Sequence, residues 1–173
     1  MRKVILYIAT SIDNYIAAKD GSVDWLFSDQ DYGYKDFERS VDAVVMGGTT
    51  YRQVLTLADE YPYAHKMSYI ITRDISYRNS GDIKFIHQDV VDHMLELKEK
   101  PGKDIWLIGG SEINTLFLIN DLIDEIWIYQ HPVILGEGIP LFGNSNSMTW
   151  FELHDLEEFD TGMLKMIYVR KKE

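Results

Sequence analysis

The chain has 173 residues, with 17 basic and 28 acidic side chains and a formal net charge of −11 at pH 7. This length fits one domain spanning residues 1–173, and 46% hydrophobic with 26% charged residues is typical of a folded globular protein. The acidic balance disfavours nucleic acid as a partner, because phosphate backbones are held by clustered Lys and Arg. The sequence contains no cysteine, which excludes disulfides, zinc–thiolate sites and cysteine nucleophiles.

The N-terminal apolar run is shorter than a signal peptide requires. It covers residues 4–9 and is interrupted at once by Thr10 and Ser11. No other stretch approaches the roughly 20 apolar residues that a membrane span needs. We therefore expect a cytoplasmic protein with no membrane partner.

Short apolar runs bounded by turn residues predict strands along the first two thirds of the chain. They cover residues 4–9, 43–46, 68–71, 83–86 and 105–108. Continuous apolarity without alternation is typical of parallel strands that are covered on both faces. Apolar residues at helical spacing predict helices at residues 31–39, 49–57, 90–97 and 111–119. This alternation of strand and helix predicts a mostly parallel sheet.

The last third of the chain follows a different pattern. Residues 124–131, 150–159 and 163–171 are expected to form longer strands, the last two joined by a tight turn that contains Gly162. A hairpin at the end of the chain indicates antiparallel strands at one sheet edge. The predicted fold class is α/β, with a mixed, mostly parallel sheet flanked by helices and antiparallel C-terminal strands.

Two predicted strands end in a pair of glycines, followed by a hydroxyl residue and a helix. Gly47 and Gly48 precede Thr49, and Gly109 and Gly110 precede Ser111. Glycine lets a ligand approach the backbone, and the start of a helix offers unpaired N–H groups to an anion. One such turn alone is commonly only a tight connection, but two of them favour a site that binds a pyrophosphate from both sides. Neither matches the G-x-G-x-x-G or P-loop pattern.

Several segments in order along the chain resemble dihydrofolate-reductase-like proteins. They are residues 10–17 (TSIDNYIA), 45–51 (VMGGTTY), 70–73 (IITR), 108–111 (IGGS) and 124–142. The last segment is most similar to the branch that contains the C-terminal reductase domain of bifunctional riboflavin deaminase-reductases. The resemblance covers nearly the whole chain. It implies the dihydrofolate-reductase-like fold, NADPH as cofactor, and hydride transfer to a pterin- or folate-like substrate or a riboflavin-pathway pyrimidine of the 5-amino-6-ribosylaminouracil type.

The resemblance also implies a set of cofactor-binding residues. These are Ala9, Ile16, Gly47, Gly48, Thr49, Thr50, Thr72, Arg73, Ile108, Gly109, Gly110, Ser111 and Glu112. Thr72 and Arg73 would lie near the ribose 2′-phosphate, since a guanidinium suits a phosphate. Relatives commonly carry a basic residue where this chain has Gly48. Either Arg73 or Arg52 compensates for it, or the preference for NADPH over NADH is weak.

On the substrate side, the resemblance implies Asp31 as a catalytic proton donor. An Asp near a helix start is equally explained by capping and by the helix dipole. Trp25 and Tyr129 are expected to stack on a flat substrate ring, and Gln130 to contact its edge. The spacing of the histidines suggests no metal site, and His131 is interpreted as a strand-end residue.

Two further expectations concern function and assembly. The alternative to a reductase is a non-catalytic protein that binds a nucleotide or heterocycle on the same fold. The late strands, together with residues 132–142, are apolar enough to form a two-fold interface, so we expect a homodimer.

Overall fold

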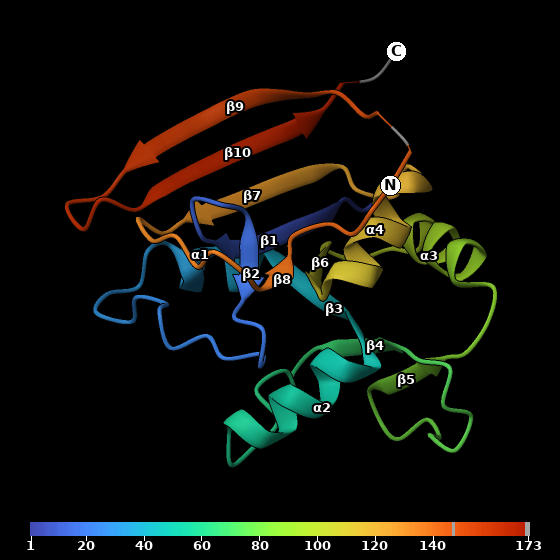
Figure 1. The fold of residues 1–173 in the computed structure, drawn as a ribbon. Helices are drawn as coiled ribbons and strands as arrows, with labels where there is room; N and C mark the ends of the chain where they lie inside the picture. The colour runs from blue at the N-terminus through green and yellow to red at the C-terminus, as the bar shows by residue number, and fades with distance from the viewer. Residues whose placement is uncertain (147, 172–173) are drawn as a thin grey trace.

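The computed structural model describes residues 1–146 and 148–171, and an eight-stranded sheet forms its centre (Figure 1). The order of the strands is β5-β4-β3-β6-β1-β7-β10-β9. In chain order they are β1 (Val4–Thr10), β3 (Val41–Gly47), β4 (Met67–Ile71), β5 (Ile83–Ile86), β6 (Asp104–Gly109), β7 (Glu125–Gln130), β9 (Phe151–Glu158) and β10 (Leu164–Arg170). The helices are α1 (Tyr34–Ser40), α2 (Gly48–Leu57), α3 (Val90–Glu99) and α4 (Ser111–Ile119).

The strands from β5 to β7 are parallel to their neighbours, which confirms the predicted parallel sheet. Alternate side chains of the central strands enter two separate cores. Leu6 and Val45 pack with Phe117 of α4 on one face, whereas Ile5 packs with Phe37 of α1 on the other. Because helices cover both faces, the central strands bury apolar residues at successive positions, as the unbroken apolar runs predict.

The C-terminal strands extend this sheet in the antiparallel sense, also as predicted. β10 pairs with β7 on one side and with β9 on the other, and the turn closes with Phe159 N–H donating to Met163 O. Figure 1 shows this hairpin reaching beyond the helices. Consequently the side chains of β9 after Phe151 are exposed on both faces.

A second, two-stranded sheet was not expected from the sequence. β2 (Tyr15–Ala17) and β8 (Ile139–Pro140) pair antiparallel, so residues 10–17 and 132–142 are joined rather than forming separate loops. Strands of two or three residues are too short to show a hydrophobic period, which explains why the pattern did not reveal them.

The helices agree with the predicted ranges except at the start of α1. The expected helix 31–39 begins instead at Tyr34, because Gly33 adopts a left-handed conformation with φ 82° and ends the preceding irregular segment. Asp31 therefore lies before the helix and not in it. Among residues 1–146 and 148–171, none of the helices combines the length and apolarity that crossing a membrane demands.

Candidate functional site

The two glycine junctions meet at the carboxyl ends of β3 and β6, which are neighbours in the sheet. A Cβ added to Gly47 would lie 3.0 Å from Cγ1 of Ile113 on α4. One added to Gly110 would lie 3.4 Å from Oγ1 of Thr50 on α2. Side chains larger than hydrogen would therefore press on the opposite helix, and glycine lets the two helix starts approach each other.

Both helix starts offer unpaired N–H groups. The N-cap residues of α2 and α4 are Gly47 and Gly110, and neither helix receives a hydrogen bond from a capping side chain. Their first turns carry a partial positive charge, next to the hydroxyls of Thr49 and Ser111. Two such ends side by side suit the phosphates of a dinucleotide.

Gly48 has a packing reason for lacking a side chain. A Cβ at this position would lie 2.9 Å from Oγ1 of Thr72, so a basic side chain, as the family resemblance implies here, does not fit without displacing Thr72. The same point is 3.6 Å from Nη1 of Arg52, whose Nη2 donates to Oγ1 of Thr49 at 3.1 Å. The guanidinium of Arg52 thus lies at the first junction.

Arg73 is placed differently from Arg52. Its side chain is 93% exposed, and Nη2 donates to Oε2 of Glu112 at 3.4 Å. This ion pair bridges the loop after β4 and the first turn of α4, so it joins the two halves of the predicted site. Of the two arginines, Arg52 is the one whose guanidinium lies within 4 Å of the Cβ position of Gly48.

The second junction is held by Asn114 of α4, which is fully buried. Its Nδ2 donates to Leu141 O at 3.0 Å, whereas Oδ1 has no hydrogen-bond partner within the described residues. A Cβ on Gly109 would lie 3.2 Å from that oxygen, and Gly109 has a φ of 113°, which side chains rarely adopt. The Gly109–Gly110 peptide bond is cis. An unpaired buried acceptor is uncommon, and a ligand donor would satisfy it.

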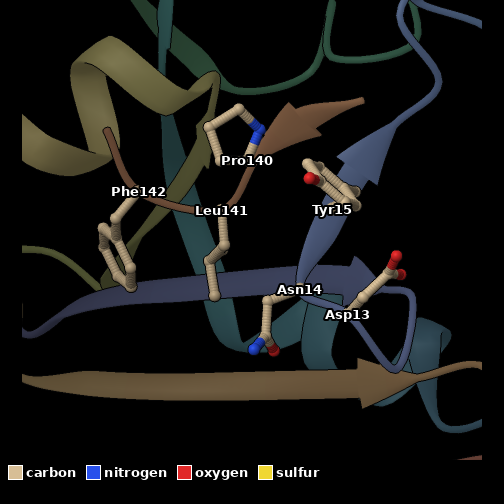
Figure 2. Close-up of a pocket in the computed structure, with 6 residues that line it drawn as sticks. All are labelled: Asp13, Asn14, Tyr15, Pro140, Leu141 and Phe142. Atoms are coloured by element: carbon tan, nitrogen blue, oxygen red, sulfur yellow. The ribbon is translucent and has the colours of Figure 1, made fainter. Parts of the chain in front are cut away.

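Leu141 also lines a pocket of about 400 Å³ between the two short strands (Figure 2). The pocket is lined by Asp13, Asn14, Tyr15, Pro140, Leu141 and Phe142. The Asp13 carboxylate accepts N–H groups of Leu135 and Gly136, at 3.1 and 2.8 Å. The Ser11 hydroxyl and these N–H groups lower the pKa of Asp13, so a stable carboxylate ties the turn before β2 to the loop before β8.

The apolar cofactor residues expected from the resemblance lie on the strands around these junctions. Ala9 is near the end of β1, beside Tyr129 of β7, and Ile16 is on β2. Ile108 is the residue before Gly109 on β6. All three apolar residues are partly buried, and β1 lies between β6 and β7.

Tyr129 belongs to an aromatic cluster that the sequence did not predict as a unit. Its ring lies 4.7 Å from that of Tyr7, which stacks on Phe37 at 4.1 Å and contacts Tyr34 at 6.3 Å. Burial raises the pKa of Tyr7, and the nearby Tyr129 adds to this effect. The Tyr129 hydroxyl is buried and has no hydrogen-bond partner in the described chain. The two tyrosine rings are therefore in contact without a hydrogen bond from the Tyr129 hydroxyl to Tyr7. Tyr7 and Ala9 are two residues apart on β1. Because successive side chains of a strand point to opposite faces, this spacing places both on the same face of the sheet.

Asp31 lies close to this cluster but is exposed. Its carboxylate faces the backbone N–H of Lys35 at 3.4 Å, which is a weak contact with the first turn of α1. Its charge is one of the influences that raise the pKa of Tyr7 and Tyr129, after burial. The neighbouring Asp29 instead accepts a hydrogen bond from the Tyr32 hydroxyl. The carboxylate of Asp31 therefore stands at the rim of the cluster.

The three expected substrate residues are not brought together around one point. Tyr129 and Gln130 are consecutive on β7, so their side chains point to opposite faces of the sheet. Trp25 packs instead against His131, with ring centroids 5.3 Å apart, and its Nε1 is buried without a partner among the residues described. His131, interpreted from the sequence only as a strand end, is the residue that links Trp25 to β7.

Within residues 1–146 and 148–171, His, Asp and Glu side chains form no group of three or more that is placed to hold a metal ion.

The fold defined by this sheet and these junctions is that of dihydrofolate reductase. The structure of dihydrofolate reductase from Enterococcus faecalis, complexed with NADP(H), matches this chain with a TM-score of 0.73 at 16% identity. The match covers 98% of this chain and 97% of that one. The fold expected from the sequence resemblance is therefore confirmed.

The chain belongs to the family of the RibD C-terminal domain, whose sequence model matches residues 2–165. The uncharacterized protein YwjB of Bacillus subtilis is 38% identical over 172 residues, which is 98% of each chain. A crystal structure from Shewanella sp. PV-4, described as a putative riboflavin biosynthesis protein, is 31% identical with a TM-score of 0.87. It covers 98% of this chain and 99% of its own.

Proposed function

We propose that this protein is an NADPH-dependent reductase that transfers a hydride to a pterin- or folate-like substrate or to a riboflavin-pathway pyrimidine. The observation that carries the proposal is the contact between the two uncapped glycine junctions at the ends of β3 and β6. The family, and the NADP(H) in the dihydrofolate reductase structure with the same fold, support it. The alternative is a protein that binds the nucleotide or a heterocycle without catalysis.

The residues present fit a dinucleotide. Gly48 and Gly109 have no room for a Cβ beside Thr72 and Asn114, and the unpaired Oδ1 of Asn114 can accept a ligand N–H. The helix starts, with Thr49 and Ser111, would hold the two phosphates. A bound nicotinamide would supply the hydride. The chain's own groups bind and orient it, and Arg52, beside the first junction, would contact the 2′-phosphate of NADPH.

For the acceptor we propose a flat ring held beside Tyr7 and Tyr129. Reduction of a C=N bond adds the hydride to carbon and a proton to nitrogen, and this proton must come from the protein or from water. We propose that Asp31, exposed at the rim of the tyrosine cluster, passes a proton from solvent. Because Asp31 is exposed, proton transfer through water is favoured over direct transfer from an acid enclosed in the site.

Titration of the purified protein with NADPH and NADH, followed by ligand fluorescence, tests the cofactor assignment. Saturable NADPH binding is the expected result, and turnover of bound NADPH with any heterocycle of a pterin and pyrimidine panel would exclude the non-catalytic alternative. Binding without turnover across the panel would favour that alternative. Absence of binding by either nucleotide would refute the proposal.

Replacing Tyr129 with Phe is expected to stabilise the free protein. The substitution removes a buried hydroxyl without a partner, and the free energy of unfolding should rise by about 1 kcal/mol, measured by urea denaturation. Tyr61→Phe is the matched control, because its hydroxyl donates to Ser68 Oγ at 2.9 Å and its loss should destabilise by about 1 kcal/mol. Equal destabilisation by both variants would show that the Tyr129 hydroxyl is paired. If this hydroxyl binds substrate, Tyr129→Phe also raises KM.

We further propose a homodimer that packs through the β9–β10 hairpin. Leu153 and Leu156 are 53% and 56% exposed, and they share a face with their cross-strand partners Tyr168 and Met166. A second copy would cover this apolar face and the free edge of β9. Light scattering at micromolar concentration should give twice the chain mass of 20.1 kDa, and Leu153→Asp should give the monomer. A monomeric wild type contradicts the proposal.

A further inference from the structure

His131 is buried at the end of β7, and each of its two ring nitrogens has a hydrogen-bond partner. It is 4% exposed, and its backbone N–H donates to Thr10 O of β1 at 2.7 Å. Nδ1 lies 3.0 Å from Tyr129 O, and Nε2 lies 3.1 Å from the backbone N of Phe27. A carbonyl only accepts and a backbone N–H only donates, so Nδ1 carries the proton and Nε2 is a bare acceptor.

The partner of this acceptor belongs to the long segment that precedes α1. Residues 18–33 have no helix or strand, and Phe27 and its following residues up to Asp31 are exposed. The rings of Trp25 and Phe27 contact the imidazole at centroid distances of 5.3 and 4.9 Å. Other contacts of the segment are made nearer its ends, by Lys19 with Glu137, by Gly21 O with Gln53, and by Tyr32 with Phe159 and Thr161. His131 therefore holds the middle of the segment.

We infer that His131 is a positioning residue which, as the neutral imidazole, fixes residues 18–33 against the ends of β1 and β7. The functional consequence rests on the proposed function. The segment carries Trp25 and Asp31, so the imidazole fixes both relative to Tyr129, whose carbonyl accepts the hydrogen bond from His131 Nδ1. A proton on Nε2 would turn the acceptor into a second donor facing the Phe27 N–H, so protonation releases the segment.

The surroundings of the imidazole determine the direction of this pH dependence. Burial lowers the pKa of His131 from its ordinary value of 6.5, partly offset by the Tyr129 carbonyl. Within the described residues, the groups against it are the rings of Trp25 and Phe27, the Thr10 carbonyl of β1, and Tyr129, whose own pKa is raised by burial. Asp24 and Asp29, the charged residues nearest to Phe27 in the segment, are exposed. The neutral form thus persists below pH 6.5, and its stabilising contribution, complete above pH 6.5, is lost as the pH falls through the lowered pKa.

Residue-resolved hydrogen exchange of the full chain, free of ligand, tests this inference. The Phe27 amide should be protected at pH 7.5 and lose about tenfold of its protection at a pH below the His131 pKa, after correction for intrinsic exchange. His131→Gln places an amide oxygen near the former Nε2 and should retain protection without pH dependence. His131→Leu, which has no acceptor, should lose protection at both pH values.

Two results would overturn the inference. One is equal protection of Phe27 at both pH values in the wild type, with His131 titration followed in the same spectra. The other is full protection in His131→Leu. The wild-type comparison needs no variant, so it stands even if His131→Leu fails to fold. Because no cofactor is present, failure of NADPH binding would leave these exchange results unchanged and would count only against the proposed function.

Discussion

Replacing Arg52 with Gln is expected to weaken NADPH binding by roughly tenfold to a hundredfold and to leave NADH binding nearly unchanged. A charge-assisted hydrogen bond contributes about 1.5–3 kcal/mol, and every 1.4 kcal/mol is tenfold in affinity. The guanidinium lies 3.6 Å from the Cβ position of Gly48, where the family resemblance implies a basic residue, and it donates to Thr49. Only NADPH has the 2′-phosphate that such a group would recognise.

Arg73→Gln is the matched control for this prediction. The Arg73 side chain is exposed and already paired with Glu112, and exposed ion pairs of this kind contribute up to about 1 kcal/mol. Its replacement should lower NADPH affinity by less than about fivefold. Fluorescence titration of both variants with NADPH and NADH distinguishes the outcomes. A larger loss in Arg73→Gln, or an equal loss for the two nucleotides in Arg52→Gln, would contradict the role of Arg52.

Gly109→Val is expected to destabilise the protein by about 3 kcal/mol and to abolish measurable NADPH binding. A φ of 113° strains any residue with a side chain by about 1–3 kcal/mol. The added Cβ also lies 3.2 Å from Oδ1 of Asn114, so Asn114 must shift and strain its hydrogen bond to Leu141. The added side chain would further cover backbone that the cofactor is proposed to contact. Thermal unfolding should show a fall in Tm of roughly 6–12 °C.

Gly81→Ala is the control that measures the cost of a side chain at a positive φ when that side chain makes no contact. Gly81 also has a positive φ, of 54°, but a Cβ there meets nothing within 4 Å. Its replacement should cost about 1 kcal/mol and leave NADPH affinity unchanged. Equal losses of unfolding free energy in Gly109→Val and Gly81→Ala would show that the contact with Asn114 contributes nothing to the destabilisation. They would contradict tight packing at the second junction.

The parts of this fold that depend on long apolar segments were predictable, whereas those that depend on single contacts were not. The central strands and the helix after each glycine pair follow from hydrophobic pattern and composition. β2 and β8 were missed because two or three residues show no period. The separation of Tyr129 from Gln130 was available from the sequence, since neighbours on a strand point to opposite faces.

The site shows the same division. The approach of the two glycine junctions follows from the strand ends, but the reason for Gly48 lies in Thr72, a residue on another segment. The roles inferred for Arg52 and His131 depend on contacts with Gly48 and with Phe27, respectively. The contact of Arg52 with Gly48 joins residues four apart on α2 and follows from helical spacing. The contact of His131 with Phe27 joins residues far apart in the chain, which no local pattern predicts.

The position of β1 in the middle of the sheet has a consequence for synthesis of the chain. Its partners are β6 and β7, with Val4 opposite Ile105 and Ile5 opposite Glu125. β1 is therefore synthesised before both of its partners and cannot complete its pairing until β6 and β7 have been made, and loops of this length close slowly. Nascent chains that stop before β7 should expose the apolar β1 and depend on chaperones until Gln130 has emerged.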